Sequence, residues 1–318
     1  MLIKHGTQGT NYYDDADVEM FRYTAYRKAN RVKAEKSYKE NKILSFPLHV
    51  IIEVSSICNI KCSFCNRENM SRKQQNMDME TFKRVVDECA ENYVHSLSLY
   101  CLGEPFLNPN LREMIIYAKA KGIPYVDVST NAMLNMNSVI GTGLDEIIVS
   151  LDGFKETHEK LRKGAKYDVV VGNLMSLINR RREVNEVRPI IRLQIIDKEE
   201  TKPEIDKFIQ EWKDKVDVIY LKNLETFAQN LGDRNISYGE IVKRLNNRQP
   251  CKQLWFVLTV DSNGDIEYCC HSPNGQAVIG NVHKGGLSSA WKKLKKIRKD
   301  HINGNYTQIC EGCVDYEW

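Results

Sequence analysis

The sequence lacks any uninterrupted apolar run of about 18 residues, the minimum length of a membrane-spanning helix. Its first residues, Met1 to Gly6, also lack the apolar stretch of a secretory signal peptide. A large excess of charge is absent too: the net charge of +4 slightly favours an anionic ligand and does not by itself indicate nucleic acid. These absences predict a cytoplasmic protein without a membrane partner. Its ten cysteines are then expected as metal ligands or reactive thiols rather than in disulfides.

Three of these cysteines, Cys58, Cys62 and Cys65, lie close together, with three residues between the first two and two between the last two. An iron–sulfur cluster normally takes four cysteines, so a local group of three indicates a cluster with one iron open to another ligand. A structural zinc ion needs its fourth ligand close by, and none follows here. A zinc site or a set of buried thiols is the alternative that the three residues alone leave open.

Beyond Pro47, apolar β-branched runs of strand length alternate with helical stretches. The order strand, helix, strand predicts parallel strands joined by right-handed crossovers. We expect strands at residues 49–54, 96–101, 124–130, 145–151, 188–196 and 216–221, and helices at residues 79–92, 109–121, 134–141, 155–182 with a break near Gly164, and 202–214. Roughly 175 residues are too few for a closed eight-unit barrel, so the predicted fold is α/β, a partial (β/α)6 barrel. Catalytic groups of such barrels collect after the strands, where the cysteine loop lies.

The cysteine spacing, with aromatic Phe64 directly before Cys65, resembles the signature of the radical S-adenosylmethionine (SAM) enzymes. The resemblance implies that the open iron of a 4Fe–4S cluster binds the amino and carboxylate groups of SAM. It also implies that the reduced cluster splits SAM into methionine and a 5′-deoxyadenosyl radical, which takes a hydrogen atom from the substrate. The protein then contributes position, electrostatics and the exclusion of side reactions.

Later strand ends carry segments that are similar to SAM-contacting motifs of this family. Gly103, Glu104 and Pro105 resemble the glycine–glutamate motif that hydrogen-bonds the SAM amino group, and a carboxylate beside an ammonium is favourable. Thr130 and Asn131 resemble the segment that contacts the ribose and methionine of SAM. Without the resemblance, Gly-Glu-Pro is a common turn, and threonine and asparagine at strand ends are turn formers or helix caps.

Two further residues are implied in the same way. Ser150 ends the fourth expected strand and resembles a serine that contacts SAM, although serine at a strand end is also an ordinary turn former. Arg162, followed by Gly164, resembles an arginine that pairs with the methionine carboxylate.

A second group of cysteines, Cys251, Cys269, Cys310 and Cys313, occupies the C-terminal stretch. Apolar runs on both sides of Asn263-Gly264 predict a β-hairpin that returns Cys269 to the side of Cys251. A helix is expected at residues 288–301, before the closing Cys310-Glu-Gly-Cys313. Four cysteines make a full metal site, and a zinc ribbon is one interpretation.

The spacing of this second group resembles the twitch form of the SPASM domain, which is appended to radical SAM barrels. The resemblance implies one auxiliary 4Fe–4S cluster on these four cysteines, because five C-terminal cysteines are too few for two clusters. Cys270 is then left over, and on a strand it points to the opposite face from Cys269. It is an inert thiol, an alternative ligand or a catalytic donor of a hydrogen atom.

These observations divide the chain into an N-terminal helical arm (residues 1–46), a radical SAM partial barrel (residues 47–235) and a twitch domain (residues 236–318). The last domain is expected as a small β-hairpin plus a helix. Residues 291–299 form a strongly basic stretch. We interpret it as the solvated face of an amphipathic helix, with a nucleic-acid surface as the sharper alternative.

The expected function is that of a radical SAM oxidoreductase that dehydrogenates a small polyhydroxylated molecule, such as a sugar, an aminocyclitol or a related metabolite. An electron donor such as flavodoxin or ferredoxin is the expected partner, and nucleic acid is not. Alternatives are an epimerase in which Cys270 returns the hydrogen atom, and a maturase that modifies a peptide. A zinc-containing nucleic-acid-binding protein is the alternative from a different class.

Overall fold

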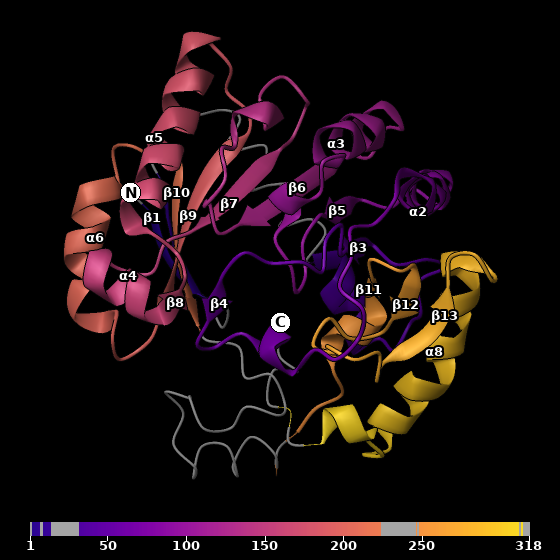
Figure 1. Cartoon of the computed structure of the whole chain (residues 1–318). Helices are drawn as coiled ribbons and strands as arrows, with labels where there is room; N and C mark the ends of the chain where they lie inside the picture. Colours follow the sequence, from indigo (N-terminus) through magenta and orange to yellow (C-terminus); the bar gives the residue numbers. More distant parts are fainter. Residues whose placement is uncertain are drawn as a thin grey trace.

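A computed structural model describes residues 2–6, 9–13, 32–223, 246, 248–311 and 313, the first two segments as backbone only. Within these residues, eleven strands form one sheet in the order β1-β2-β10-β9-β7-β6-β5-β3-β11-β12-β13. Figure 1 shows the sheet curving in an arc with helices on its outer side. The strands are β1 (Leu2–Gly6), β2 (Gly9–Tyr13), β3 (His49–Ile52), β5 (Ser96–Ser98), β6 (Tyr125–Thr130), β7 (Glu146–Ser150), β9 (Ile190–Asp197), β10 (Val218–Asn223), β11 (Val257–Val260), β12 (Asp265–Glu267) and β13 (Val278–Asn281).

The six strands expected for the barrel are present and parallel. β3 pairs with β5, β5 with β6, β6 with β7, β7 with β9, and β9 with β10, all in parallel register. Their runs are apolar because both faces of a parallel sheet are covered. The α/β partial-barrel fold is therefore confirmed, and the carboxyl ends of these strands share one edge of the sheet.

Helices lie on the outside of the arc, and all of them except α8, which follows the last strand, stand between strands in the sequence. They are α2 (Met79–Glu91), α3 (Leu111–Ala120), α4 (Lys155–Leu161), α5 (Tyr167–Glu183), α6 (Ile205–Trp212) and α8 (Gly286–Ile302). α2 begins where the Asp78 side chain accepts a hydrogen bond from the backbone N–H of Thr81, at 2.7 Å. The expected break near Gly164 is present between α4 and α5, where Gly164 adopts a φ of 93° that favours glycine.

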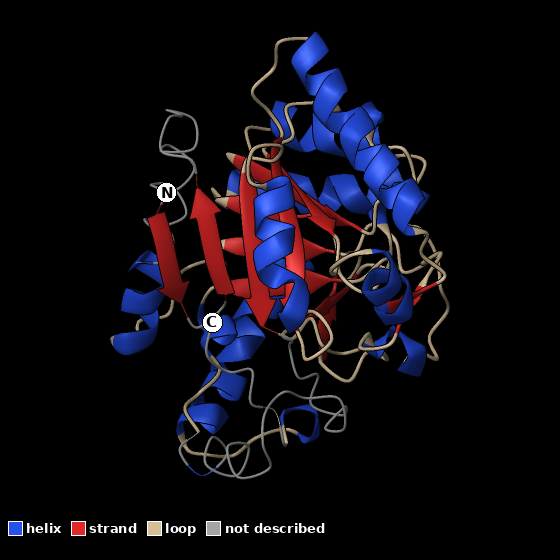
Figure 2. Cartoon of the chain, turned by 90° about the vertical axis from the view of Figure 1, so that its left-hand side faces the viewer, coloured by secondary structure: helices blue, strands red, loops and turns tan. Residues whose placement is uncertain are grey.

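Two expected elements were wrong. Residues 134–141 contain only a 3-10 turn, Asn137–Val139, because Asn135 accepts a hydrogen bond from the backbone N–H of Asn137, a local bond that competes with helix formation. The N-terminal arm is not simply helical, because β1 and β2 form a hairpin whose second strand pairs antiparallel with β10. Figure 2 shows this part of the chain from the side. Residues 32–39 are helical, whereas residues 14–31 of the expected helical arm lie outside the described residues.

The C-terminal hairpin is present and extends the barrel sheet. β11 and β12 pair antiparallel around the Asn263-Gly264 turn, as expected. β11 also pairs in parallel with β3, with Val260 opposite Ile52, so the sheet continues from the barrel into the C-terminal segment. The expected helix corresponds to α8, which packs Trp291 and Leu294 into a core continuous with that of the barrel. The domain boundary near residue 235 falls outside the described residues.

Candidate functional site

The first three cysteines lie on the loop after β3, where two short strands fix their backbone. β4 (Lys61–Cys62) pairs antiparallel with β8 (Arg162–Lys163), which places Cys62 opposite Arg162. The backbone N–H of Cys65 donates to the carbonyl of Cys62 at 3.1 Å, which folds the end of the loop back. All three cysteine side chains pack together with Phe64 around the small apolar cluster of Ile60 and Ala165. The structure therefore brings the sequence-predicted cysteines together.

Two arginines flank this cysteine loop. Arg162 is buried, its Nη1 lies 3.7 Å from the Sγ of Cys62, and its guanidinium lies 5.4 Å from the centre of the Phe64 ring. Burial raises the pKa of Cys62 to about 12, and the charge of Arg162 opposes that rise. Burial likewise raises the pKa of Cys65, against the charges of Arg162 and Arg67. Buried thiols with cations beside them suit an anionic iron–sulfur cluster, because iron takes the place of the thiol protons.

Glu104 lies beside this loop, and three hydrogen-bond donors of the protein surround its carboxylate. The residue is 2% exposed, and its carboxylate accepts hydrogen bonds from the Thr130 hydroxyl (2.7 Å) and the backbone N–H groups of Asn131 (2.8 Å) and Phe106 (3.2 Å). Burial raises the pKa of Glu104, whereas these hydrogen bonds lower it. A carboxylate has about four acceptor positions, so three protein donors leave capacity for one more.

Neighbouring residues connect Glu104 to the cysteine loop. The Asn131 side chain donates to the Asn59 side chain at 2.8 Å, and its Nδ2 lies 3.8 Å from the Sγ of Cys58. A Cβ on Gly103 would lie only 2.0 Å from the carbonyl oxygen of Ser55, so glycine is required for this close approach. Pro105 begins the 3-10 turn that presents the Phe106 N–H to Glu104. The predicted Gly-Glu-Pro segment therefore lies against the loop of three cysteines.

The structure gives Arg162 specific partners within the protein. Its Nε donates to Asp152 at 2.7 Å, and the other carboxylate oxygen of Asp152 accepts from the backbone N–H of Ile196 at 2.8 Å. Arg162 thus links the end of β7 to Cys62. Its predicted pairing with the methionine carboxylate stays a prediction. Ser150, the last residue of β7, is buried at the same edge of the sheet.

The four C-terminal cysteines gather from separate elements. Cys251 precedes the 3-10 turn before β11, Cys269 follows β12, and Cys310 and Cys313 follow α8. Burial raises the pKa of Cys251 to about 12, and the neighbouring Cys313 and Cys310 add to the rise. Burial also raises the pKa of Cys269, with further contributions from Cys270 and then from Cys251 and Cys313. Cys251 and Cys269 thus each have other cysteines of this C-terminal group as neighbours, and Cys270 also lies beside Cys269.

Hydrogen-bond donors already point at two of these sulfurs. The backbone N–H of His271 donates to the Sγ of Cys269 at 3.4 Å, and the Thr307 hydroxyl donates to the Sγ of Cys310 at 3.3 Å. Hydrogen bonds donated to a cysteine sulfur stabilise its thiolate form and shift the reduction potential of a bound cluster. Among the residues that the structure describes, no three His, Cys, Asp or Glu side chains are arranged to hold a single metal ion. The cysteines of a four-iron cluster bind different irons, so this finding does not bear on a cluster.

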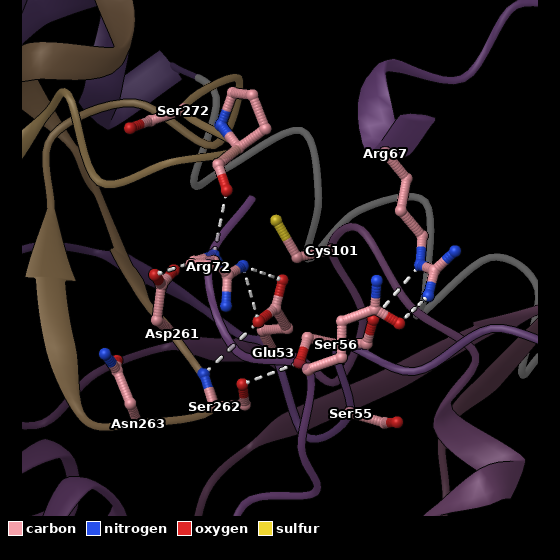
Figure 3. Close-up of polar contacts among 12 residues, drawn as sticks. Glu53, Ser55, Ser56, Arg67, Arg72, Cys101, Asp261, Ser262, Asn263 and Ser272 are labelled. Carbon is pink, nitrogen blue, oxygen red and sulfur yellow. Dashed lines mark hydrogen bonds and ion pairs between the residues drawn. The ribbon is translucent and has the colours of Figure 1, made fainter. Parts of the chain in front are cut away.

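A buried polar network that the sequence analysis missed joins the two cysteine regions (Figure 3). Arg72 donates from Nη2 to both carboxylate oxygens of Glu53 at 2.7 Å and from Nε to the carbonyl of Pro273 at 3.0 Å, and it lies 3.5 Å from Asp261. Glu53 and Asp261 directly follow β3 and β11, so the parallel pairing of these strands sets the two carboxylates side by side. The available signal was Glu53, a carboxylate within the apolar stretch 49–54 that was expected as a strand.

Asn274 and Cys101 make further contacts at the same junction. The Asn274 side chain accepts from the backbone N–H of Ser71 at 2.5 Å and donates to the carbonyl of Asn69 at 2.7 Å, which ties the loop after the three cysteines to the loop after Cys270. The thiol of Cys101 donates to the carbonyl of Cys270 at 3.5 Å. Burial raises the pKa of Cys101 well above its usual value, so this thiol stays protonated.

Family comparisons agree with this arrangement. The profile of the Radical SAM superfamily matches residues 52–189, and that of an iron-sulfur cluster-binding domain, SPASM, matches residues 251–314. The chain belongs to the radical SAM superfamily. Its domains imply 4Fe–4S clusters and SAM as cofactors, and the residues described above fit both groups. No helix among the described residues is long and apolar enough to cross a membrane.

Individual relatives share part of the chain or the fold. The GTP 3′,8-cyclase of Chlorobaculum tepidum is 32% identical over 33% of this chain and 32% of its own length. The matches to the first three curated relatives span only 30–43% of those proteins. BtrN in complex with AdoMet and 2-DOIA has a TM-score of 0.54 at 18% identity, covering 81% of this chain and 88% of BtrN. SuiB of Streptococcus suis, bound to its precursor peptide SuiA, has a TM-score of 0.62 at 16% identity, covering 91% and 74%.

Proposed function

We propose that this radical SAM enzyme is an oxidoreductase that dehydrogenates a small polyhydroxylated metabolite, such as a sugar or an aminocyclitol. The observation that supports it is the combination of one local three-cysteine site with one group of four cysteines. SAM and a 4Fe–4S cluster supply, when bound at the first site, a 5′-deoxyadenosyl radical that abstracts a hydrogen atom. Cys58, Cys62 and Cys65 would hold that cluster, with Phe64 and Arg162 packed beside it.

Glu104 would orient SAM through the one acceptor position that its three protein donors leave. An ammonium group at that position forms a charge-assisted hydrogen bond, which is stronger than a neutral one. Thr130 and Asn131 hold the carboxylate in place, and Ser150 lies at the same edge of the sheet. Gly103 and Pro105 shape the loop that carries Glu104.

Cys251, Cys269, Cys310 and Cys313 would hold an auxiliary 4Fe–4S cluster, which supplies an acceptor for one electron. Dehydrogenation of an alcohol removes two hydrogens, one as the abstracted atom and one as a proton with an electron. Four cysteines saturate a cluster and leave no open iron, so the site suits electron transfer better than substrate binding. A reductant of the flavodoxin or ferredoxin kind would deliver the electron that starts each turnover.

Epimerisation is a second candidate, because Cys270 is half-buried at the junction with the barrel loop that carries Cys101. A thiol there can return a hydrogen atom to the substrate carbon. Peptides are the alternative substrate class, as in the SuiB complex. Here the outer strand β1 pairs only with β2 among the described strands, and an open edge of this kind can accept an extended peptide.

The test supplies the reconstituted enzyme with dithionite, SAM and a panel of deuterated sugars, aminocyclitols and short peptides. We expect deuterium to move from one of the polyols into 5′-deoxyadenosine and the product to be a ketone. A product of inverted configuration that carries a hydrogen atom from solvent would support epimerisation instead of dehydrogenation, provided that the Cys270→Ala variant no longer forms it. Deuterium transfer only from peptides would contradict the proposed substrate class.

A further inference from the structure

The last long helix, α8, has two faces of opposite character. Trp291, Leu294 and Arg298 are buried, and the Nε of Arg298 donates to the carbonyl of Leu254 at 2.7 Å. On the opposite side lie four exposed lysines at spacings of three and four residues, which we call the lysine face: Lys292, Lys295, Lys296 and Lys299. Figure 1 shows α8 along the outer edge of the molecule, beside β13. Anchoring of the buried face therefore holds the lysine face toward solvent.

Several exposed cations on other helices pair with acids one turn away. Examples are Arg84 with Glu80 in α2, Arg180 with Glu183 in α5, and Lys215 with Glu211 after α6. No carboxylate among the described residues pairs with any lysine of the lysine face. Instead these lysines are one another's neighbours at i,i+3 and i,i+4, and like charges at such spacings destabilise a helix. A negatively charged partner bound to the lysine face would relieve this repulsion between the lysines.

The C-terminal end of α8 reaches the second cysteine group. His301, in the last turn, accepts a hydrogen bond at its Nδ1 from the backbone N–H of Cys251, at 3.5 Å. Lys299 lies two residues before His301, and Cys310 follows the helix after a short connection. A protein docked on the C-terminal end of the lysine face, at Lys299, would therefore lie about one helix diameter, roughly 10 Å, from the residue that contacts Cys251. The rate of electron transfer falls steeply with the distance between donor and acceptor. A protein that exchanges electrons with this cysteine group must therefore dock near it.

We propose that the lysine face is the docking surface of an acidic one-electron carrier protein, which exchanges electrons with the site formed by Cys251, Cys269, Cys310 and Cys313. The inference rests on the proposed function, in which that site receives one electron per turnover. The electron leaves when the carrier is reduced by one electron and the site is reoxidised. Charged surfaces of opposite sign accelerate such encounters and make them sensitive to salt.

Nucleic acid fits this surface less well. Single-stranded nucleic acids bind on aromatic platforms, and the aromatic residue of α8, Trp291, is buried with its Nε1 donating to the carbonyl of Leu44 at 2.8 Å. Direct readout of DNA bases uses side chains with several directed hydrogen bonds, above all arginine, asparagine and glutamine. The exposed charges of α8 are all lysines, which suit a loosely specific and short-lived protein encounter.

The test compares two charge-reversal variants. Lys295→Glu/Lys299→Glu changes the lysine face, and Lys207→Glu/Lys213→Glu changes exposed lysines of α6 and its end, on the opposite side in Figure 1. Two replacements of lysine by glutamate subtract four charges, so each variant goes from +4 to zero and matches the other in net charge. The probe is a flavodoxin of strongly negative charge. Its Kd is measured by calorimetry, and stopped-flow absorbance follows the reduction of oxidised flavodoxin by the reduced, reductant-free protein at low and high KCl.

We expect the α8 variant to raise the Kd of flavodoxin at least tenfold and to flatten the salt dependence of the reduction rate, while the α6 variant stays within twofold of wild type. Equal losses in both variants, or no loss in either, would overturn the proposal. So would tighter binding of a short DNA duplex than of flavodoxin, if the α8 variant alone abolished it. Dithionite needs no docking surface: if it yields no 5′-deoxyadenosine in wild type, the proposed function fails while calorimetry still decides the docking.

Discussion

The two cysteine regions differ in how the chain assembles them. The first is local: one loop carries all three thiols, and β4 pairing with β8 sets Arg162 beside Cys62. The second draws its four thiols from a stretch of chain that includes a hairpin and a 17-residue helix. The local site has three cysteines and a nearby carboxylate cradle around Glu104, whereas the dispersed site has four cysteines.

The difference indicates a division of labour. A site with three protein ligands keeps a position for a reacting molecule, as catalytic metal sites do, whereas a site with four is closed and suits structure or electron transfer. The network of Arg72, Glu53 and Asp261 holds the two regions together at the ends of β3 and β11. The following predictions alter one region at a time, in order of decreasing effect.

Removal of the thiols should give the largest difference in activity between variants of the two sites. The variant Cys58→Ala/Cys62→Ala/Cys65→Ala should lower 5′-deoxyadenosine formation by about a thousandfold or more and iron from about eight to about four per chain. The variant Cys310→Ala/Cys313→Ala should also lose about four irons but still form 5′-deoxyadenosine. Chromatography of the nucleoside and iron analysis after anaerobic purification provide the measurements. Survival of 5′-deoxyadenosine formation in the triple variant would remove the distinction between the sites.

The buried ion pair beside the open site should matter for stability. Arg162→Gln leaves Asp152 charged and buried without its cation, which should lower the free energy of unfolding by about 3–5 kcal/mol. Arg180→Gln breaks the exposed pair with Glu183 and should cost about 0–1 kcal/mol. Anaerobic urea unfolding measures both. Equal losses in the two variants would show that Arg162 contributes no more than a surface cation.

Loss of charge at Glu104 should weaken SAM binding. Glu104→Gln keeps the size of the side chain but replaces one carboxylate oxygen by an amide, so the ammonium of SAM loses a charged partner. A hydrogen bond to a charged group contributes about 1.5–3 kcal/mol, so the Kd of SAM should rise roughly 10- to 150-fold. Equilibrium dialysis under anaerobic conditions measures it. The exposed Glu113→Gln is the control, and an equal shift there would contradict the role of Glu104.

The carboxylates between the two regions should give the smallest effect, seen as a pH dependence. Burial raises the pKa of Asp261 from 3.8 to about 7, and the adjacent Glu53 adds to the rise. The folded protein then binds a proton that the unfolded chain has released, so the contribution of Asp261 to stability falls as pH rises from about 4 to about 7. Relative to wild type, Asp261→Asn should gain about 1 kcal/mol between pH 5 and pH 6, the value of roughly one pKa unit. Urea unfolding of both proteins at both pH values measures this change. An equal difference in stability between wild type and variant at the two pH values would show that Asp261 does not titrate in this way.

The barrel was predictable from sequence because its signals are local. Parallel strands are buried on both faces, so runs such as His49–Ile52 and Tyr125–Thr130 are recognisable from their β-branched and apolar residues. The cysteine loop was predictable for the same reason, since its spacing lies within one loop. The N-terminal hairpin had a weaker local signal, because its two strands, Leu2–Gly6 and Gly9–Tyr13, are only five residues long each.

The junction between the regions was not predictable. Pairing of β11 with β3 joins residues about 200 positions apart, and no local pattern specifies which barrel strand receives the hairpin. Once that pairing exists, Glu53 and Asp261 become neighbours and Arg72 becomes the cation between them. A charge within an apolar strand signals that a partner exists, but only the tertiary structure identifies it.

The most direct test of the difference between the open and the closed site is the electron paramagnetic resonance spectrum of the reduced protein with and without SAM. The measurement uses wild type, the triple variant of Cys58, Cys62 and Cys65, and the double variant of Cys310 and Cys313. We expect SAM to change the signal of wild type and of the double variant and to leave the signal of the triple variant unchanged. A SAM-dependent change that persists in the triple variant would place the open site among the C-terminal cysteines and contradict the account.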